Sequence, residues 1–183
     1  TRAAVLSEMG RPRPYSQTRP LTIEEVDLDP LGPGEVLVRM RAAGLCHSDL
    51  SVINGDRPRP MPMIIGHEGA GVVEEVGGAV RSIKLGDHVV MSAAYCTYCT
   101  QCRSGNVAYC ENLFAEDFGG RRTTDGTTSL ETPNGGLVSS HFFGQSSFAT
   151  YANVVESALI AVPKDLPLES VGFLGCGMQT GAG

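Results

Sequence analysis

The sequence contains no long apolar run and few basic residues. Spanning a bilayer takes roughly 20 consecutive apolar residues, and no stretch of this 183-residue chain approaches that length, so no membrane-spanning segment is predicted. The 14 lysine and arginine residues are scattered and are outnumbered by 20 acidic residues, which gives a formal charge of −6. This distribution disfavours a nucleic acid or an anionic membrane surface as a partner.

The chain also has few helix-like stretches, because its dominant hydrophobic periodicity is two. Short apolar runs bounded by glycine- and proline-containing turns are typical of β-strands. Five strands are predicted, at Ala3–Leu6, Glu35–Arg41, Gly71–Val76, His88–Met91 and Ala149–Val155. With 42% apolar residues, the chain suits one domain or slightly more. We therefore expect a mainly β fold with a few short helices, as a small barrel or sandwich.

Two short helices and one long irregular segment complete this prediction. The helices are predicted at Ser48–Ile53 and Leu168–Leu174, and Ser48 or Asp49 can cap the first of them. The segment 115–140 is rich in glycine, threonine and serine. A connection of this length is expected to be a surface excursion with a function of its own.

Cysteines are few, six in all, yet four of them are concentrated in one short segment. They are Cys96, Cys99, Cys102 and Cys110. Four thiolates at this spacing can enclose a tetrahedral zinc ion with bonds of about 2.3 Å. Because four protein ligands fill the coordination sphere, the spacing predicts a structural zinc lobe at about 92–113 that performs no chemistry.

Two other interpretations of the four cysteines remain open from the residues alone. A pair of disulfides is one, although such close spacing makes good bridge geometry difficult and the composition fits a reducing, cytoplasmic setting. An iron–sulfur centre is the other. The bacterial ferredoxin run places its fourth cysteine after a gap of three residues and follows it with proline, whereas here the gap is seven residues and Glu111 follows. Zinc is therefore the preferred interpretation.

The remaining cysteines and the four histidines are candidates for a second, reactive metal site. Such a site has three protein ligands and one open position. Cys46 lies at a predicted strand-to-helix transition, whereas His67 and Cys176 lie beside glycines, which let the backbone approach a ligand closely. Taken singly, each cysteine also fits a small core residue. His88 fits a structural imidazole, and His141 fits either a pocket or a strand cap.

Three motifs occur in order along the chain: Gly-Leu-Cys-His-Ser-Asp-Leu at 44–50, Gly-His-Glu-Gly-Ala-Gly at 66–71, and the four-cysteine segment at 96–110. Together they resemble the zinc-dependent alcohol dehydrogenases of the medium-chain dehydrogenase/reductase superfamily, and the resemblance covers essentially the whole chain. It implies a GroES-like β-barrel catalytic domain over residues 1–183. It also implies an NAD-linked oxidoreductase with two zinc ions per chain, which in the full-length form is a homodimer.

The resemblance further implies roles for individual residues. The implied ligands of a catalytic zinc ion are Cys46, His67 and Cys176. The four cysteines of 96–110 would hold the structural zinc ion. Asp49 and Glu68 would orient the catalytic ligands, with Asp49 accepting the imidazole N–H of His67. Ser48 would take the proton of the alcohol, although a helix N-cap is its simplest structural interpretation.

Cofactor and substrate contacts are implied in the same way. His47 would meet the pyrophosphate of the dinucleotide, and Thr180 would lie beside the nicotinamide ring. Phe142 and Phe143 would line the alcohol pocket, and Ser92 stands where relatives often carry a bulkier side chain. The expected substrate is therefore a primary alcohol, including a bulky or aromatic one, or the corresponding aldehyde.

Two departures from the family pattern qualify these expectations. Ser51 stands where many relatives end the proton relay with histidine, so the proton must leave through water or another group. The chain also stops at Gly183 without a strand-turn-helix unit whose glycine-rich turn could bind a dinucleotide. We therefore expect a cofactor-binding domain to start just after residue 183, and the isolated chain to be inactive. The competing hypothesis is a zinc-stabilised GroES-like binding module without catalysis.

Overall fold

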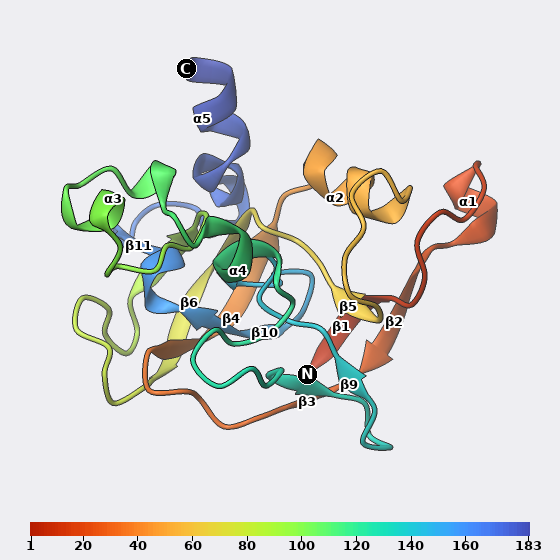
Figure 1. Ribbon diagram of the computed structural model, residues 1–183, viewed down its shortest axis with the longest axis horizontal. Coiled ribbons are helices and arrows are strands. Elements are labelled where there is room, and N and C mark those ends of the chain that lie inside the picture. Colours follow the sequence, from red (N-terminus) through yellow and green to blue (C-terminus); the bar gives the residue numbers. More distant parts are fainter.

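The computed structural model describes all residues from Thr1 to Gly183, and strands and turns dominate it (Figure 1). The strands form one sheet of five strands and two sheets of three. In chain order they are β1 (Arg2–Leu6), β2 (Leu21–Glu25), β3 (Asp27–Leu28), β4 (Glu35–Ala43), β5 (Met63–Ile64), β6 (Gly69–Val76), β7 (His88–Met91), β8 (Leu130–Glu131), β9 (Leu137–Val138), β10 (Tyr151–Val155) and β11 (Leu159–Val162). The mainly β fold expected from the sequence is confirmed.

Helices are short and lie between or beyond the strands. The α-helices are α1 (Tyr15–Thr18), α2 (His47–Ile53), α3 (Thr100–Arg103), α4 (Leu113–Phe118) and α5 (Gly177–Ala182). Five turns of 3₁₀-helix complete the secondary structure: η1 (Val107–Tyr109), η2 (Phe142–Gly144), η3 (Glu156–Ala158), η4 (Leu168–Ser170) and η5 (Gly172–Gly175). None of these helices is long and apolar enough to cross a membrane.

The five-stranded sheet has the order β10-β4-β6-β7-β11, and every neighbouring pair in it is antiparallel. Alternate side chains of β4 point to one face of the sheet, which puts the fully buried Val36 and Val38 into the main core with Val89 and Val154. Burying a valine contributes about 1.5 kcal/mol or more. This core is therefore the rigid base from which the loops carrying the candidate ligands project.

The segment 115–140 is only in part the surface excursion that was expected. Its stretch 123–127 is exposed, but β8 and β9 pair with each other, and β3 completes their small sheet. Leu130 and Val138 are buried in a second core cluster with Val5 and Ile64. The segment is thus part of the folded body, because its two apolar residues complete a core that the first strand begins.

All five predicted strands are present, with small shifts at their ends. The last of them begins at Tyr151, since Ala149 forms only an isolated bridge with Ala3. The predicted helix Leu168–Leu174 is wrong, because the chain forms two separate 3₁₀ turns, η4 and η5. Gly172 passes so close to the barrel that a Cβ there would lie 2.6 Å from the carbonyl oxygen of Glu68. The strands that were not predicted are β2, β3, β5, β8, β9 and β11.

The first predicted helix is present as α2, but Cys46 is its N-cap, so Ser48 and Asp49 lie in its first turn. Figure 1 shows α2 and α5 on one side of the sheets, with α5 standing away from the body and carrying the C-terminus. No residue of α5 is buried. The segment around α3 and η1 projects on another side. These placements separate the two cysteine-containing sites.

Candidate metal centres

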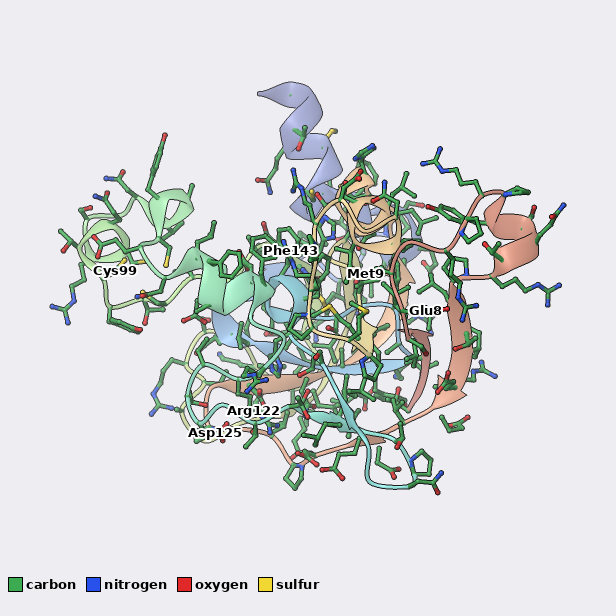
Figure 2. All side chains as sticks on the ribbon, turned by 45° about the vertical axis from the view of Figure 1, so that its right-hand side comes forward. Glu8, Met9, Cys99, Arg122, Asp125 and Phe143 are labelled. Carbon is green, nitrogen blue, oxygen red and sulfur yellow. The ribbon has the colours of Figure 1, made fainter.

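The first site is the four-cysteine cluster in the lobe 92–113. The sulfur atoms of Cys96, Cys99, Cys102 and Cys110 all lie within 4.8 Å of one another. The Sγ atoms of Cys96 and Cys102 are 4.0 Å apart, close to the separation of about 3.8 Å between sulfur ligands on a tetrahedral zinc ion. Figure 2 shows Cys99 on the projecting lobe, well separated from Phe143. The cluster fits a closed, structural zinc site.

The cysteine thiols of the lobe, when ionised, also favour binding of a cation. All six cysteines of the chain are free, which argues against the disulfide alternative. Burial opposes ionisation of Cys96, but hydrogen bonds from Asn112 and from backbone amides lower the pKa of its thiol to about 6. Burial and the neighbouring thiols raise the pKa of Cys102 to about 12. Four ionised sulfurs at these distances repel one another, and a bound divalent cation removes that repulsion.

The second cluster gathers residues that are far apart in the sequence. Cys46 lies at the start of α2, His67 between β5 and β6, and Cys176 between η5 and α5. Their ligand atoms and a carboxylate oxygen of Glu68 lie within 4.8 Å of one another. The two Sγ atoms are 3.9 Å apart. The three expected ligands are therefore brought together, as the sequence motifs predicted.

His67 supplies the clearest sign that a ligand belongs in this cluster. Its side chain is buried, and its Nε2 atom has no hydrogen-bond partner. Its Nδ1 atom is 3.2 Å from Oδ1 of Asp49. A buried polar nitrogen without a partner costs free energy, whereas an imidazole held on one nitrogen by a carboxylate commonly binds a metal through the other. The donor set of two thiols and one imidazole fits zinc.

Asp49 holds two of the three candidate ligands. Its Oδ1 atom also accepts a hydrogen bond of 3.0 Å from the amide of Gly66, and its Oδ2 atom accepts one of 3.0 Å from the amide of Cys46. Asp49 is almost completely buried. One carboxylate in the first turn of α2 thus fixes both the N-cap residue and the imidazole.

Glu68 lies closer to the cluster than an orienting role alone requires. A Cβ added to Gly44 would lie 2.1 Å from Oε2 of Glu68, so only glycine fits beside this carboxylate. Its Oε1 atom accepts a hydrogen bond of 2.9 Å from the amide of Gly177, directly after Cys176. Glu68 therefore both supports the third ligand and places its own oxygen within reach of the ligand atoms.

The thiols of the second cluster differ in acidity. Burial opposes ionisation of Cys46, but hydrogen bonds from the amide and hydroxyl of Ser48, with the nearby imidazole, lower the pKa of this thiol. Burial, the Cys46 charge and Glu68 raise the pKa of Cys176 to about 12. Ionising both thiols beside Glu68 would therefore place several negative charges around one point. A cation bound there would relieve it, as in the lobe.

A cleft of about 180 Å³ opens beside the second cluster, and its lining includes His67, Ser92, Phe143, Cys176 and Thr180. The ring of Phe143 stacks on the imidazole at 4.2 Å between centroids, and Figure 2 shows this residue at the base of α5. The lining combines an aromatic wall with the metal-binding atoms. Such a cleft suits a small molecule with one polar end.

Phe142 does not line this cleft, in contrast to the expectation. It is buried in the core on another side of His67, with the two rings edge to face at 5.6 Å. The two phenylalanines diverge because Phe143 adopts a left-handed backbone conformation, with φ of 53°. Phe142 and Phe143 are adjacent in the sequence, but one lies in the core and the other lines the cleft.

The other expected residues lie around the rim or away from it. His47 is exposed on the first turn of α2, and Thr180 is exposed on α5, where its hydroxyl donates to the carbonyl of Cys176. His141 reaches neither a pocket nor a strand cap, because its Nε2 atom is 2.7 Å from the buried carboxylate of Glu35. His88 opens β7 and takes no part in either cluster.

One residue of the site was not predicted from the sequence. Gln145 is buried, and its side-chain amide makes three hydrogen bonds to backbone groups of Gly69, His67 and Ser92. A single glutamine in a polar run such as Gly-Gln-Ser-Ser carries no spacing signal that marks it as buried. Only the three-dimensional arrangement identifies it.

Comparison with known proteins identifies a family for most of the chain. Residues 32–164 match the family described as the alcohol dehydrogenase GroES-like domain. The geraniol dehydrogenase of Castellaniella defragrans is 44% identical over 181 residues, which cover 99% of this chain and 46% of that protein.

Two crystal structures share the fold over 99% of this chain. An alcohol dehydrogenase zinc-binding domain protein from Burkholderia ambifaria is 46% identical with a TM-score of 0.90, and the benzyl alcohol dehydrogenase of Acinetobacter calcoaceticus is 42% identical with a TM-score of 0.85. In each case 46% of the other chain is covered, so this chain spans about half the length of the relatives it matches. The GroES-like fold is confirmed, without a dinucleotide-binding unit among the described elements. The chain belongs to the zinc-dependent alcohol dehydrogenases of the medium-chain dehydrogenase/reductase superfamily.

Proposed function

We propose that this chain carries the metal site of a dehydrogenase that interconverts a primary alcohol and its aldehyde, with hydride transfer to or from NAD. The observation that carries the proposal is the second cluster, in which two thiols and a buried imidazole with a free Nε2 atom converge beside a cleft. Three such ligands with one open side are typical of catalytic rather than structural zinc.

In this proposal Cys46, His67 and Cys176 hold the catalytic zinc ion, and the four cysteines of the lobe hold a second, structural one. A bound zinc ion supplies a Lewis acid that polarises the substrate oxygen. Asp49 keeps the proton on Nδ1 of the imidazole, so that Nε2 is the nitrogen free to bind metal. Glu68 fixes the backbone after Cys176 through the Gly177 amide.

Ser48 is proposed to accept the proton of the alcohol. Ser48 lies in the first turn of α2, two residues after Cys46, and its hydroxyl helps to lower the pKa of the Cys46 thiol. Ser51, where relatives often have histidine, is buried and donates its hydroxyl to the carbonyl oxygen of His47 at 3.0 Å. Because the Ser51 hydroxyl is bonded to the His47 carbonyl oxygen, we propose that the proton leaves Ser48 through water and not through Ser51.

The cofactor is proposed to lie over the exposed residues of α2 and α5. His47 would neutralise part of the pyrophosphate charge, and Thr180, at the cleft, would meet the nicotinamide ring. No strand-turn-helix unit for a dinucleotide is present within residues 1–183. We propose that a separate cofactor domain after residue 183 makes most of the NAD contacts, since this chain covers only 46% of relatives such as the geraniol dehydrogenase.

The substrate is proposed to be a bulky or aromatic primary alcohol, or its aldehyde. Ser92 presents a small side chain to the cleft, and the Phe143 ring offers a flat apolar wall. The names of two relatives, a geraniol dehydrogenase and a benzyl alcohol dehydrogenase, support the same choice. We further propose a homodimer in the cytoplasm, where the six free thiols stay reduced.

The test compares metal content and activity in the full-length protein. We expect two zinc ions per chain and NAD-dependent oxidation of geraniol and benzyl alcohol. Cys176→Ser should leave one zinc ion and reduce kcat/KM at least 100-fold, because the third ligand is weakened. A single zinc ion in the parent protein, with no alcohol oxidation, would support the alternative of a zinc-stabilised binding module. The isolated chain 1–183 is expected to be inactive with either alcohol.

A further inference from the structure

Gln145 connects the two segments that border the second cluster. Its Nε2 atom donates to the carbonyl oxygens of His67 at 3.0 Å and of Ser92 at 3.1 Å, and its Oε1 atom accepts from the amide of Gly69 at 3.2 Å. Both N–H groups and the oxygen of the Gln145 side-chain amide are thus hydrogen-bonded, each to a backbone group. A buried amide that is fully satisfied in this way fixes the groups it contacts.

Ser92 extends the connection to the third ligand. Its hydroxyl donates to the carbonyl oxygen of Gly175 at 2.8 Å, one residue before Cys176. The packing there is tight, because a Cβ on Gly175 would lie 1.6 Å from the carbonyl oxygen of Met91. A continuous series of hydrogen bonds therefore runs from the backbone of His67, through Gln145 and Ser92, to the residue that precedes Cys176.

The turn that carries Gln145 has an uncommon backbone. His141, Phe143 and Ser146 have positive φ angles of 59°, 53° and 53°, and they account for three of the five non-glycine residues with positive φ in the chain. Such residues are strained and persist only where their surroundings hold them. Strain concentrated in one turn indicates that the direction of its side chains matters.

The surroundings of this turn do hold it in place. The hydroxyl of Ser146 accepts from the amide of Phe142 at 3.0 Å and donates to the carbonyl oxygen of Ile64 at 2.6 Å. A Cβ on Gly144 would approach side-chain atoms of Ala94 and Val155 to 2.7 Å, so this position accepts only glycine. The turn can therefore direct both the Phe143 ring and the Gln145 amide toward His67.

We propose that Gln145 is a positioning residue of the catalytic metal site, which sets the separation between His67 and Cys176 together with Ser92. The inference rests on the proposed zinc site at Cys46, His67 and Cys176. Asp49 connects Cys46 with His67, and Glu68, next to His67, holds the amide after Cys176. The Gln145–Ser92 pair adds a second link, from the His67 backbone to the residue before Cys176. Loss of this connection loosens the site on the side of Cys176.

The test measures how fast each zinc ion of the full-length protein is lost to a chelator. Gln145→Met keeps the length of the side chain and removes all three hydrogen bonds. We expect zinc loss from the catalytic site to be about 10–100-fold faster, the range typical for partners of metal ligands, with the lobe zinc unchanged. The matched control is Asn153→Leu, which removes a buried amide bonded to the Asp29 carbonyl, away from the cluster. It should leave both release rates as in the parent.

Two further variants keep the test decisive if Gln145→Met does not fold. Gln145→Glu preserves the side-chain shape and the bond to Gly69. It replaces the amide N–H groups by an oxygen that faces the carbonyl oxygens of His67 and Ser92. Ser92→Ala removes only the bond to Gly175. With cobalt in the catalytic site, both variants should shift the absorption bands of the metal, whereas Asn153→Leu should not. Unchanged zinc loss and unchanged cobalt spectra in every folded Gln145 and Ser92 variant would overturn the inference. A parent protein that binds only one zinc ion would instead overturn the proposed function.

Discussion

Asp49, Glu68 and Gln145 hold the ligands of the second cluster, and all three are buried. Each binds backbone groups next to a ligand instead of facing solvent, so their positions are set by the fold and not by a bound molecule. Asp49 and Glu68 were expected from the family resemblance, in which each lies within three residues of an expected ligand. Gln145 escaped prediction because it is remote in sequence and its neighbours show no periodic pattern.

Asp117 is a buried carboxyl group that stays protonated well above the usual pH. Its Oδ1 atom accepts from the amide of Ala94 at 2.8 Å, but Oδ2 has no partner. Burial raises the pKa of this carboxyl to about 7. The folded protein therefore keeps a proton that the unfolded chain releases near pH 4, so stability declines as the pH rises from about 4 to 7.

We expect Asp117→Asn to stabilise the protein at pH 8 by on the order of 2 kcal/mol, because it removes a buried charge, although it leaves a buried amide donor unpaired. At pH 5 only the first part of this loss of stability has accrued, and the unpaired amide donor offsets it, so little or no gain is expected. Urea unfolding at the two pH values measures the difference. An equal effect at both values would show that the carboxyl is not protonated in the folded state.

At the scale of elements, we expect the lobe around α3 to depend on a metal ion more than on its small core. Apart from the cysteines, only Tyr95 and Leu113 pack against its small apolar cluster. Structural zinc sites of this kind contribute directly to folding. The lobe should therefore be the part of the molecule that opens when its metal is removed.

Cys99→Ser should lower the zinc content by one ion and expose residues 92–113 to hydrogen exchange, while β4 and β6 keep their protection. Exchange followed by mass spectrometry on peptides of the full-length protein tests this. Ser104→Ala, an exposed change in the same lobe, should alter neither quantity. Loss of protection throughout the central sheet would contradict the assignment of the lobe as a separate unit.

The strands and helices differ in how well the sequence predicts them. β4 was predicted because its apolar residues alternate, as Val36 and Val38 do. β6 and β7 were predicted as short apolar runs between turns. β2 and β11 were not: the short β2 alternates but buries none of its residues, and Ile23 is exposed, whereas β11 is a continuous apolar run without alternation, in which Ile160 is exposed. The region 168–174 looks helical by composition, but the close approach of Gly172 to Glu68 divides it.

At the scale of the whole molecule, one buried ion pair ties the excursion 115–140 to the central sheet. Arg122 donates to both carboxylate oxygens of Glu35 at 2.9 and 3.0 Å, and His141 and the amide of Gly32 complete the contacts of this carboxylate. Burial opposes ionisation of Glu35, but these hydrogen bonds and the charge of His141 lower its pKa to about 2. The sequence did not predict this pair, because its members are remote from each other along the chain.

This pair predicts a specific sensitivity to acid. A carboxyl with a lowered folded-state pKa stabilises the fold above its unfolded pKa, near 4.5, and the contribution of about 3 kcal/mol is lost as the pH falls toward 2. Glu35→Gln should therefore be less stable than the parent at pH 7 and lose less stability between pH 5 and pH 2. Chemical denaturation across this range measures both quantities. Glu25→Gln, at an exposed site, should follow the parent, and the same behaviour in Glu35→Gln would argue against the pair.

The spacing of the two metal sites along the chain also sets an order of events during synthesis. The lobe ligands all lie between Cys96 and Cys110 and leave the ribosome almost together, whereas the second site is complete only when Cys176 has emerged. At about 5–20 residues per second, this separates the two by several seconds. A nascent chain can thus load its structural ion first. In the proposed assignment the catalytic ion has no complete site until Cys176 joins the folded sheets, so we expect no exposed catalytic metal on the unfinished protein.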